Sequence, residues 1–349
     1  MGRVKAAGNS LARRIRIGHD GPMPVVPPKL HPGSSVRVIA PSRSLAMIGA
    51  EARAEADKKL AALGLRVSFG EHVEEADDFV SSPVAARLAD LHAAFADPGV
   101  DGILTVIGGH NSNQLLTGID YGLVAANPKV LCGFSDITAL SNALYARTGL
   151  VGYSGPHYSS FGMKHHFGYT EAGFVACLMR DDPFRIEPSP TWSDDEWYLD
   201  QEDRRLETGT DWWVLQEGEA AGTIVGGNLC TFNLLQGTPY LPPLDGTVVF
   251  AEDDDLVEPW TFDRDLVSLL QQPGFGGVRG LVIGRFQRKT GMTRELMAQI
   301  VATKPELAGL PVLANVDFGH TTPTATFPIG GTVEVRADRS APSVTIVSH

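Results

Sequence analysis

The turn between Cys132 and Ile137 is a candidate site for a nucleophile. An apolar run, KVLCGF, ends there and a helix-like run, DITALSNALYARTG, begins, with Ser135 between them. A serine on a sharp strand-to-helix turn holds its Oγ out of the sheet, and the N–H groups at the start of the helix can stabilise an oxyanion. The turn reads G-F-S-D-I, so it meets the hydrolase pattern GxSxG only in part. The alternative is that Ser135 or Asp136 is simply an N-cap of the helix.

Two further residues could activate such a serine, because a neutral hydroxyl needs a base and a group that orients the base. His320 follows the apolar stretch LPVLANVDFG at a Gly-His-Thr-Thr-Pro turn, and Glu252 ends the apolar stretch GTVVFAE. Both lie at the end of a predicted strand, where a rigid scaffold fixes the side chain. The alternatives are a surface histidine for His320 and, for Glu252, a solvated acidic loop or a cation site, because the acidic run EDDDLVE begins there.

Two pairs of glycines also end apolar stretches. Gly108 and Gly109 follow GILTVI, where a backbone N–H that no side chain shields could supply a second oxyanion donor. Gly226 and Gly227 precede Asn228 at an apparent helix start. Neither pair forms a phosphate-binding loop of the GxGxxG or GxxxxGK[ST] type. The chain also has no HExxH motif and no Cys/His cluster with zinc spacing, so we expect neither a metal nor another cofactor.

The composition is that of a globular enzyme and argues against several other classes. The chain has 349 residues, 43% hydrophobic and 20% charged, which fits a two-domain protein. A net charge of −12 opposes binding to nucleic acid. No apolar run reaches the roughly 18–20 residues that span a membrane, and the three cysteines have no CxxC spacing, so we expect a cytoplasmic protein with reduced thiols. Among them, Cys132 should be buried and inert because it lies within a predicted strand.

A parallel sheet must position the serine turn. Strands without polar alternation are predicted in residues 35–42, 65–70, 102–109 and 129–134, and helices in residues 50–64, 82–97 and 136–149. Strands that alternate with helices in this way are typical of a parallel sheet covered on both faces. We therefore expect a flexible extension over residues 1–30, followed by a doubly wound α/β domain over residues 31–175 that carries the serine elbow.

The pattern of the sequence changes after residue 175. Four of the five tryptophans lie in residues 191–213, among acidic residues, and we expect residues 176–220 to form a linker or lid. Further strands are predicted in residues 246–252, 280–286, 310–319 and 330–336, with helices in residues 262–271 and 293–304. They predict a smaller C-terminal domain, residues 221–349, with a mixed α/β, barrel-like sheet that carries Glu252 and His320.

Six stretches, in register along the chain, resemble one family of serine peptidases. They are IGGHNSNQLL, GFSDITAL, GYSGPHYSSFG, GGNLCTFNLLQGTPY, VVFAEDDD and NVDFGHTTPTATFPIG. Each is modest alone, but together they cover the chain from about residue 28 to its end. The family includes the LD-carboxypeptidases and the microcin C immunity peptidase.

The resemblance implies roles for the residues already singled out. It implies a Ser-Glu-His triad of Ser135, Glu252 and His320 that is split between the two domains. His320 would take the proton of Ser135, and Glu252 would orient the imidazole. The implied oxyanion donors are the backbone N–H groups of Gly109 and Asp136. The resemblance also implies a homodimer.

Within the family, the chain is more similar to the immunity-type branch than to the cell-wall enzymes. The stretch IGGHN stands where LD-carboxypeptidases usually show R-G-G-Y-G, and the tryptophan-rich stretch resembles an insert of the immunity-type branch. The implied substrate is a small peptidyl- or aminoacyl-nucleotide amide. Trp192 and Trp197 would stack on its aromatic or nucleobase part, and Gly108 and Asn228 would also contact it.

Three alternatives stay open. Trp192 and Trp197 could instead anchor the insert on the core. The substrate could be a muropeptide tetrapeptide, from which an LD-carboxypeptidase removes the terminal D-alanine. A non-catalytic protein could sequester a peptide or nucleotide on this scaffold, and its serine, glutamate and histidine would then lie too far apart for a hydrogen-bonded relay. One departure is also clear: residues 253–255 are acidic, where some immunity-type members carry a basic residue, which weakens the case for anion recognition from that position.

Overall fold

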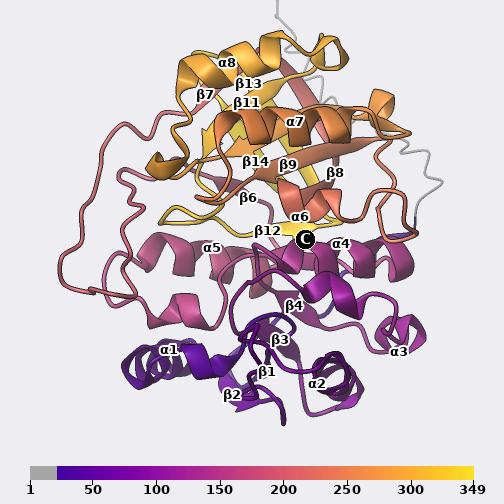
Figure 1. Ribbon diagram of the computed structural model, residues 1–349, viewed down its shortest axis with the longest axis vertical. Helices are drawn as coiled ribbons and strands as arrows, with labels where there is room; N and C mark the ends of the chain where they lie inside the picture. The colour runs from indigo at the N-terminus through magenta and orange to yellow at the C-terminus, as the bar shows by residue number, and fades with distance from the viewer. Residues whose placement is uncertain (1–21) are drawn as a thin grey trace, which may run out of the picture.

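The computed structural model describes residues 22–349, which form two α/β units stacked along the long axis of the molecule (Figure 1). Residues 1–21 of the predicted extension lie outside the described residues. The rest of it, residues 22–30, is tied to the fold, because Val25 forms a β-bridge with Leu150 and Leu30 is buried in the core. The folded chain therefore begins earlier than the predicted residue 31.

The N-terminal unit is built on a six-stranded sheet with the order β12-β5-β4-β3-β1-β2. Five strands are parallel, and β12 is antiparallel to β5. The strands are β1 (Ser35–Ile39), β2 (Arg66–Phe69), β3 (Gly102–Thr105), β4 (Val130–Cys132), β5 (Gly152–Ser154) and β12 (Phe327–Ile329). The helices are α1 (Ala50–Ala62), α2 (Val84–Ala96), α3 (Tyr121–Ala126), α4 (Ile137–Thr148) and α5 (Gly168–Leu178).

Both faces of this sheet are covered by helices, as two neighbouring residues of β3 show. Ile103 packs into one apolar cluster with residues of α2 and α4, whereas Leu104 packs into a second cluster with residues of α1 and α5. Side chains alternate between the faces of a strand, so these two clusters are the two faces of the sheet. Cys132 in β4 is fully buried and burial raises the pKa of its thiol, which confirms that it lies inside the strand.

The C-terminal unit has a mixed sheet of eight strands with the order β6-β14-β13-β8-β9-β10-β11-β7. Strands β8 to β11 are parallel and the remaining pairings are antiparallel. Its elements are β6 (Phe184–Ile186), β7 (Trp213–Gln216), β8 (Gly218–Asn228), α6 (Leu229–Asn233), β9 (Thr247–Glu252), α7 (Pro259–Leu270), β10 (Gly280–Gly284), α8 (Arg294–Ala302), β11 (Val312–Val316), β13 (Thr332–Ala337) and β14 (Ser343–Ser348). Since β6 and β7 form opposite edges, the sheet is open and not a barrel, and it has more strands than the N-terminal sheet.

Three short strands join a sheet across the predicted boundaries. β12 comes from the predicted C-terminal domain but joins the N-terminal sheet, and β6 and β7 come from the predicted linker but join the C-terminal sheet. What remains of the linker is a loop, residues 187–212, which we call the β6–β7 loop; it runs along one side of both units (Figure 1). Within residues 22–349, no helix is long and apolar enough to cross a membrane.

Helix α4 lies between the two units and contacts both (Figure 1). Its first nine residues, Ile137 to Tyr145, are all buried, because one side packs on the N-terminal sheet and the other on β8 and α6. The helix ends at Gly149, which adopts a left-handed conformation and donates its N–H to the carbonyl of Tyr145 at 2.8 Å. The start of α4, where the serine turn lies, is therefore fixed from both units.

Candidate active site

The serine turn has the backbone geometry of a nucleophile elbow. Ser135 lies between β4 and α4 with φ of 59°, a left-handed conformation that is rare for residues other than glycine. Such strain persists only where the surrounding structure enforces it, and it is concentrated at functional sites. Its Oγ lies 3.0 Å from His320 Nε2, and within the described chain no side-chain hydrogen bond caps α4. The position of the Ser135 side chain therefore favours the nucleophile interpretation over a capping role.

Three side chains from distant parts of the chain form a continuous relay. His320 Nε2 lies 3.0 Å from Ser135 Oγ, and His320 Nδ1 lies 2.7 Å from Glu252 Oε2. A carboxylate can only accept a hydrogen bond, so Nδ1 carries a proton and donates it to Glu252. In the neutral imidazole, Nε2 is then the acceptor that faces the serine hydroxyl. These distances argue against a scaffold in which the three residues lie too far apart for a relay.

The glycine that precedes His320 is required by the close approach of Glu252. Gly319 has φ of 107°, and a Cβ at this position would lie 2.6 Å from Glu252 Oε2. Any side chain here would collide with the carboxylate that holds the imidazole. Glu252 ends β9 and His320 follows β11, with β10 between them in the sheet, so the relay joins the carboxyl ends of parallel strands.

His320 is strongly influenced by the surrounding carboxylates. Burial lowers the pKa of its imidazole, but Glu252, followed by Asp254 and Asp253, outweighs burial and raises this pKa to about 9. At neutral pH without substrate the imidazole therefore carries a proton on both nitrogens. It can accept a proton from Ser135 only after it has lost the one on Nε2.

Gly108 lies against the serine, and Asp136 and Gly109 are the next residues along their respective loops. A Cβ at Gly108 would lie 2.8 Å from both Cβ and Oγ of Ser135, so only glycine fits against the serine. Among residues 22–349, neither Gly109 nor Asp136 donates its backbone N–H to another protein group. Both N–H groups are thus available to bind an oxyanion, which is the role that the resemblance implies.

The side chain of Asp136 has a function that the sequence did not indicate. Its Oδ2 accepts hydrogen bonds from the hydroxyl of Ser42 at 2.6 Å and from the N–H groups of Asn111 and Ser112 at 3.0 and 2.8 Å. It makes no capping bond to α4. The carboxylate therefore ties the loop after Gly109 to the serine turn, which fixes the two proposed oxyanion donors relative to each other.

Asn228 does not lie where a substrate could reach it. Its side chain is 2% exposed and caps α6, because its Oδ1 accepts the N–H of Thr231 at 3.1 Å. Its Nδ2 donates to Asp253 Oδ1 at 3.1 Å, and Asp253 Oδ2 also accepts the N–H of Cys230. Burial, followed by the charge of Glu252, raises the pKa of Asp253 to about 7. The prediction that Asn228 binds substrate is thus not supported, since its polar atoms are already used inside the protein.

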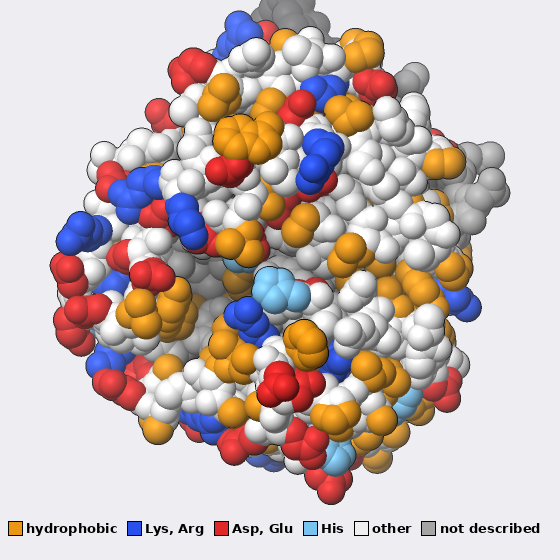
Figure 2. Space-filling model, viewed as in Figure 1, with side chains coloured by type: hydrophobic (Ala, Val, Ile, Leu, Met, Phe, Trp, Pro, Cys, Tyr) orange, Lys and Arg blue, Asp and Glu red, His pale blue; other side chains and the backbone are white. Residues whose placement is uncertain are grey.

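A large cavity of about 1260 Å³ opens in front of the relay, between the two units. Figure 2 shows this hollow on the front face, with charged side chains around its rim. Ser135, His320 and Trp197 line it, but Trp192 does not. The ring of Trp192 instead lies 5.3 Å from the guanidinium of Arg285. The position of Trp192 favours the alternative that it anchors the loop, whereas Trp197 is placed where it could contact a ligand.

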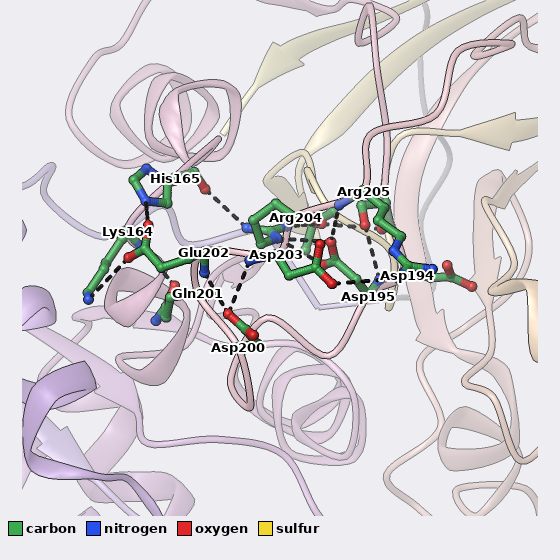
Figure 3. Close-up of polar contacts among 12 residues, drawn as sticks. Lys164, His165, Asp194, Asp195, Asp200, Gln201, Glu202, Asp203, Arg204 and Arg205 are labelled. Carbon is green, nitrogen blue, oxygen red and sulfur yellow. Dashed lines mark hydrogen bonds and ion pairs between the residues drawn. The ribbon is translucent and has the colours of Figure 1, made fainter.

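The β6–β7 loop is attached to both units by polar contacts, several of which are drawn in Figure 3. Glu202 pairs with Lys164 at 3.6 Å and with His165 at 3.2 Å, both in the N-terminal unit. On the other unit, Arg288 pairs with Asp194 and, at 2.6 Å, with Glu207. The loop therefore forms one wall of the cavity in a defined position.

A second histidine of the cavity wall, His157, was not among the predicted site residues. His157 is buried and its ring lies 4.5 Å from that of Phe134, beside the relay. Its Nδ1 lies 2.7 Å from the hydroxyl of Thr105, whereas its Nε2 has no hydrogen-bond partner among the described residues. Burial, followed by the charge of His320, lowers the pKa of His157 to about 3, so this second imidazole stays neutral. His157 lies in the stretch GYSGPHYSSFG, which in the sequence is one of the six stretches that resemble the family but indicates no role for the histidine.

The chain is similar to known carboxypeptidases along most of its length. The chain matches the LD-carboxypeptidase N-terminal domain over residues 36–155 and the LD-carboxypeptidase C-terminal domain over residues 221–335. The protein YocD of Bacillus subtilis (strain 168), which is named as a carboxypeptidase, is 49% identical over 321 residues, 92% of this chain and 99% of its own length.

Solved structures match the chain over a similar extent. An MccF-like protein from Bacillus anthracis str. Ames superposes with a TM-score of 0.92 at 49% identity, covering 93% of this chain and 100% of its own. The microcin C7 self-immunity protein MccF in complex with aspartyl sulfamoyl adenosine superposes with a TM-score of 0.84 at 25% identity, covering 93% of this chain and 99% of its own. The chain therefore belongs to the LD-carboxypeptidase family and is a carboxypeptidase of the serine hydrolase type.

Proposed function

We propose that Ser135, Glu252 and His320 form the catalytic triad of this hydrolase. The observation that carries the proposal is the unbroken relay from Glu252 through both ring nitrogens of His320 to the serine hydroxyl. Each neighbouring pair lies within hydrogen-bonding distance, which is the geometric criterion for a serine and its general base. The left-handed backbone of Ser135 adds independent support.

In the proposed reaction, neutral His320 accepts the proton of the Ser135 hydroxyl while Oγ attacks the carbonyl carbon of an amide. The N–H groups of Gly109 and Asp136 stabilise the resulting oxyanion. The amide C–N bond then breaks, the leaving nitrogen takes the proton from His320, and an acyl-enzyme remains on Ser135. A water molecule attacks this ester with His320 again as base, which releases the acid and restores the serine.

The proposed substrate is the amide of a peptidyl- or aminoacyl-nucleotide. MccF, which shares this fold and 25% of aligned residues, is known in complex with aspartyl sulfamoyl adenosine. The cavity of about 1260 Å³ is large enough for such a ligand, and Trp197 lines it with an aromatic ring on which a base could stack. Gly108 lies against the serine and would contact the reacting carbonyl group. The proposal assigns no substrate contact to Trp192 or Asn228.

A second candidate substrate is a muropeptide tetrapeptide that ends in D-alanine. It is favoured by the carboxypeptidase name of YocD, at 49% identity, and by the match to LD-carboxypeptidase domains. Both candidates present an amide whose nitrogen carries an acidic group, so the same relay would serve either one.

The test is to measure hydrolysis of both substrate types side by side. We expect release of D-alanine from the tetrapeptide or of sulfamoyl adenosine from aspartyl sulfamoyl adenosine, and chromatography measures either product. The Ser135→Ala variant should lose turnover by at least about a thousandfold while keeping its unfolding temperature. Near-full activity of this variant would disprove the assignment of Ser135. The substrate that the protein hydrolyses faster identifies which of the two candidate functions is correct.

A further inference from the structure

We propose that Arg43 binds the acidic group that is attached to the leaving nitrogen of the substrate. This inference rests on the proposed function, because it needs an amide attacked by Ser135. The acidic group is the terminal carboxylate of a peptide or the sulfamate or phosphoramidate of an acyl nucleotide. Arg43 would then be the residue that restricts the enzyme to amides next to such a group.

The position of Arg43 beside the oxyanion loop is fixed by its backbone. Its N–H donates to the carbonyl of Gly108 at 3.3 Å, and it forms a β-bridge with Ser81. The stem of the side chain lies against the same loop, since an ideal Cβ at Gly109 would be 2.9 Å from Arg43 Cγ. Gly108 in turn touches Ser135, so one residue separates the arginine from the nucleophile.

The reach required of Arg43 is short. By standard bond lengths, the carboxylate carbon of a terminal residue lies roughly 4 Å from the carbonyl carbon that the serine attacks. Arg43 and Ser135 line the same cavity. The acidic group of a bound substrate would therefore lie beside the proposed oxyanion donors, where the guanidinium can meet it.

The charges around the cavity leave Arg43 as its uncompensated cation. Most charged residues of the wall are acidic: Glu51, Asp194, Asp195, Glu196, Asp200, Glu202, Asp254 and Asp255. The three basic ones differ in their partners. Lys164 pairs with Glu51 and Glu202, and Lys289 pairs with Asp255 at 2.7 Å. Among residues 22–349, Arg43 has no carboxylate partner within ion-pair distance.

The single side-chain partner of the Arg43 guanidinium within the described chain is a neutral one. Its Nη2 donates to His110 Nε2 at 3.1 Å, which requires that the proton of this imidazole lies on Nδ1. His110 thus orients the guanidinium without cancelling its charge. An arginine presents two parallel N–H donors that match the two oxygens of a carboxylate or sulfamate. In an otherwise acidic cavity, an anionic group is attracted to this position and repelled from the rest of the wall.

The test measures binding without turnover. Calorimetric titrations use Ser135→Ala protein with three probes: a muropeptide tetrapeptide ending in D-alanine, the same peptide ending in D-alaninamide, and aspartyl sulfamoyl adenosine. We expect tight binding of at least one anionic probe, which identifies the source of the acidic group. Introducing Arg43→Gln into the Ser135→Ala protein should weaken binding of that anionic probe about 10- to 100-fold, as expected for loss of charged hydrogen bonds. The affinity for the peptide that ends in D-alaninamide should stay unchanged.

Two variants separate a specific contact from a general change of charge. Lys289→Gln removes the same charge from the same cavity, and we expect it to change anion binding less than about threefold because Asp255 already neutralises this lysine. Arg43→Lys should recover part of the loss. Equal weakening by Arg43→Gln and Lys289→Gln, or no binding of either anionic probe, would overturn the inference.

The two proposals can fail separately. If the wild-type protein hydrolyses a probe but Arg43→Gln binds it normally, only the role of Arg43 is wrong. If anion binding depends on Arg43 but the wild-type protein hydrolyses neither probe, the proposed reaction is wrong and the binding site stands.

Discussion

At the scale of single residues, Gly108 offers a direct test of the space around the nucleophile. A Cβ at this position would lie 2.8 Å from Ser135 Oγ, closer than real carbon contacts allow. The Gly108→Ala variant should therefore displace the serine and lower kcat by about a hundredfold or more, with little change in the unfolding temperature. Gly168→Ala is a matched control, because nothing lies within 4 Å of its Cβ and we expect full activity. Unchanged steady-state kinetics for Gly108→Ala would show that the serine is not held as described.

The pKa of His320 predicts how the rate depends on pH. The free imidazole acts as a base only when neutral, and its pKa is raised to about 9. The value of kcat/KM should therefore fall about tenfold for each pH unit below this pKa and level off above it. In Glu252→Gln, loss of the carboxylate removes the largest influence that raises the pKa of His320. The midpoint of the pH profile of kcat/KM should therefore move to lower pH, and its plateau at high pH should fall on the order of a thousandfold. A midpoint that Glu252→Gln leaves in place would contradict the relay.

At the scale of elements, the three residues of the relay could be singled out because each lies at the end of a buried strand, and the family resemblance implied that they act together. Ser135 and His320 come after β4 and β11, and Glu252 is the last residue of β9. The role of the Asp136 carboxylate could not be predicted, because its three partners come from two other loops. The capping role of Asn228 could not be predicted for a similar reason, since a capping asparagine and a ligand-binding one have the same sequence pattern until the position of Asp253 is known.

The sheets that the short strands β6 and β12 join could not be predicted from the sequence either. β6 and β12 have three residues each, too few for a recognisable alternation of polar and apolar side chains. Both join their sheets at an edge, through pairings with strands far away in the chain. Length and local composition therefore indicate two α/β units but not which sheet each short strand joins.

The attachment of the β6–β7 loop can be tested through Arg288. This arginine pairs with Asp194 and Glu207 and lies 5.6 Å from the ring of Trp192. Arg288→Ala should loosen this wall of the cavity, so KM should rise about three- to tenfold while kcat changes less than about twofold. Limited proteolysis should cut the loop faster in this variant. The control is Arg264→Ala, an exposed arginine whose partner Asp265 is 3.8 Å away; equal behaviour of both variants would mean that Arg288 does not hold the loop.

At the scale of the whole molecule, the proposed triad exists only while the two units are docked. Ser135 belongs to the N-terminal unit, whereas Glu252 and His320 belong to the C-terminal one. The docking is secured by one apolar cluster that includes Leu140 of α4 together with Phe250 of β9. We therefore expect the reactivity of the serine to depend on residues of the other unit.

The most direct measurement is covalent labelling of the protein by a fluorophosphonate, followed by intact-mass and peptide mass spectrometry. We predict one adduct per chain, located on Ser135, and no adduct in Ser135→Ala. In His320→Ala, labelling should be slower by at least about a hundredfold, because the hydroxyl loses its base. An adduct on another residue, or an undiminished labelling rate in His320→Ala, would contradict the proposal that Ser135 is the nucleophile activated by His320.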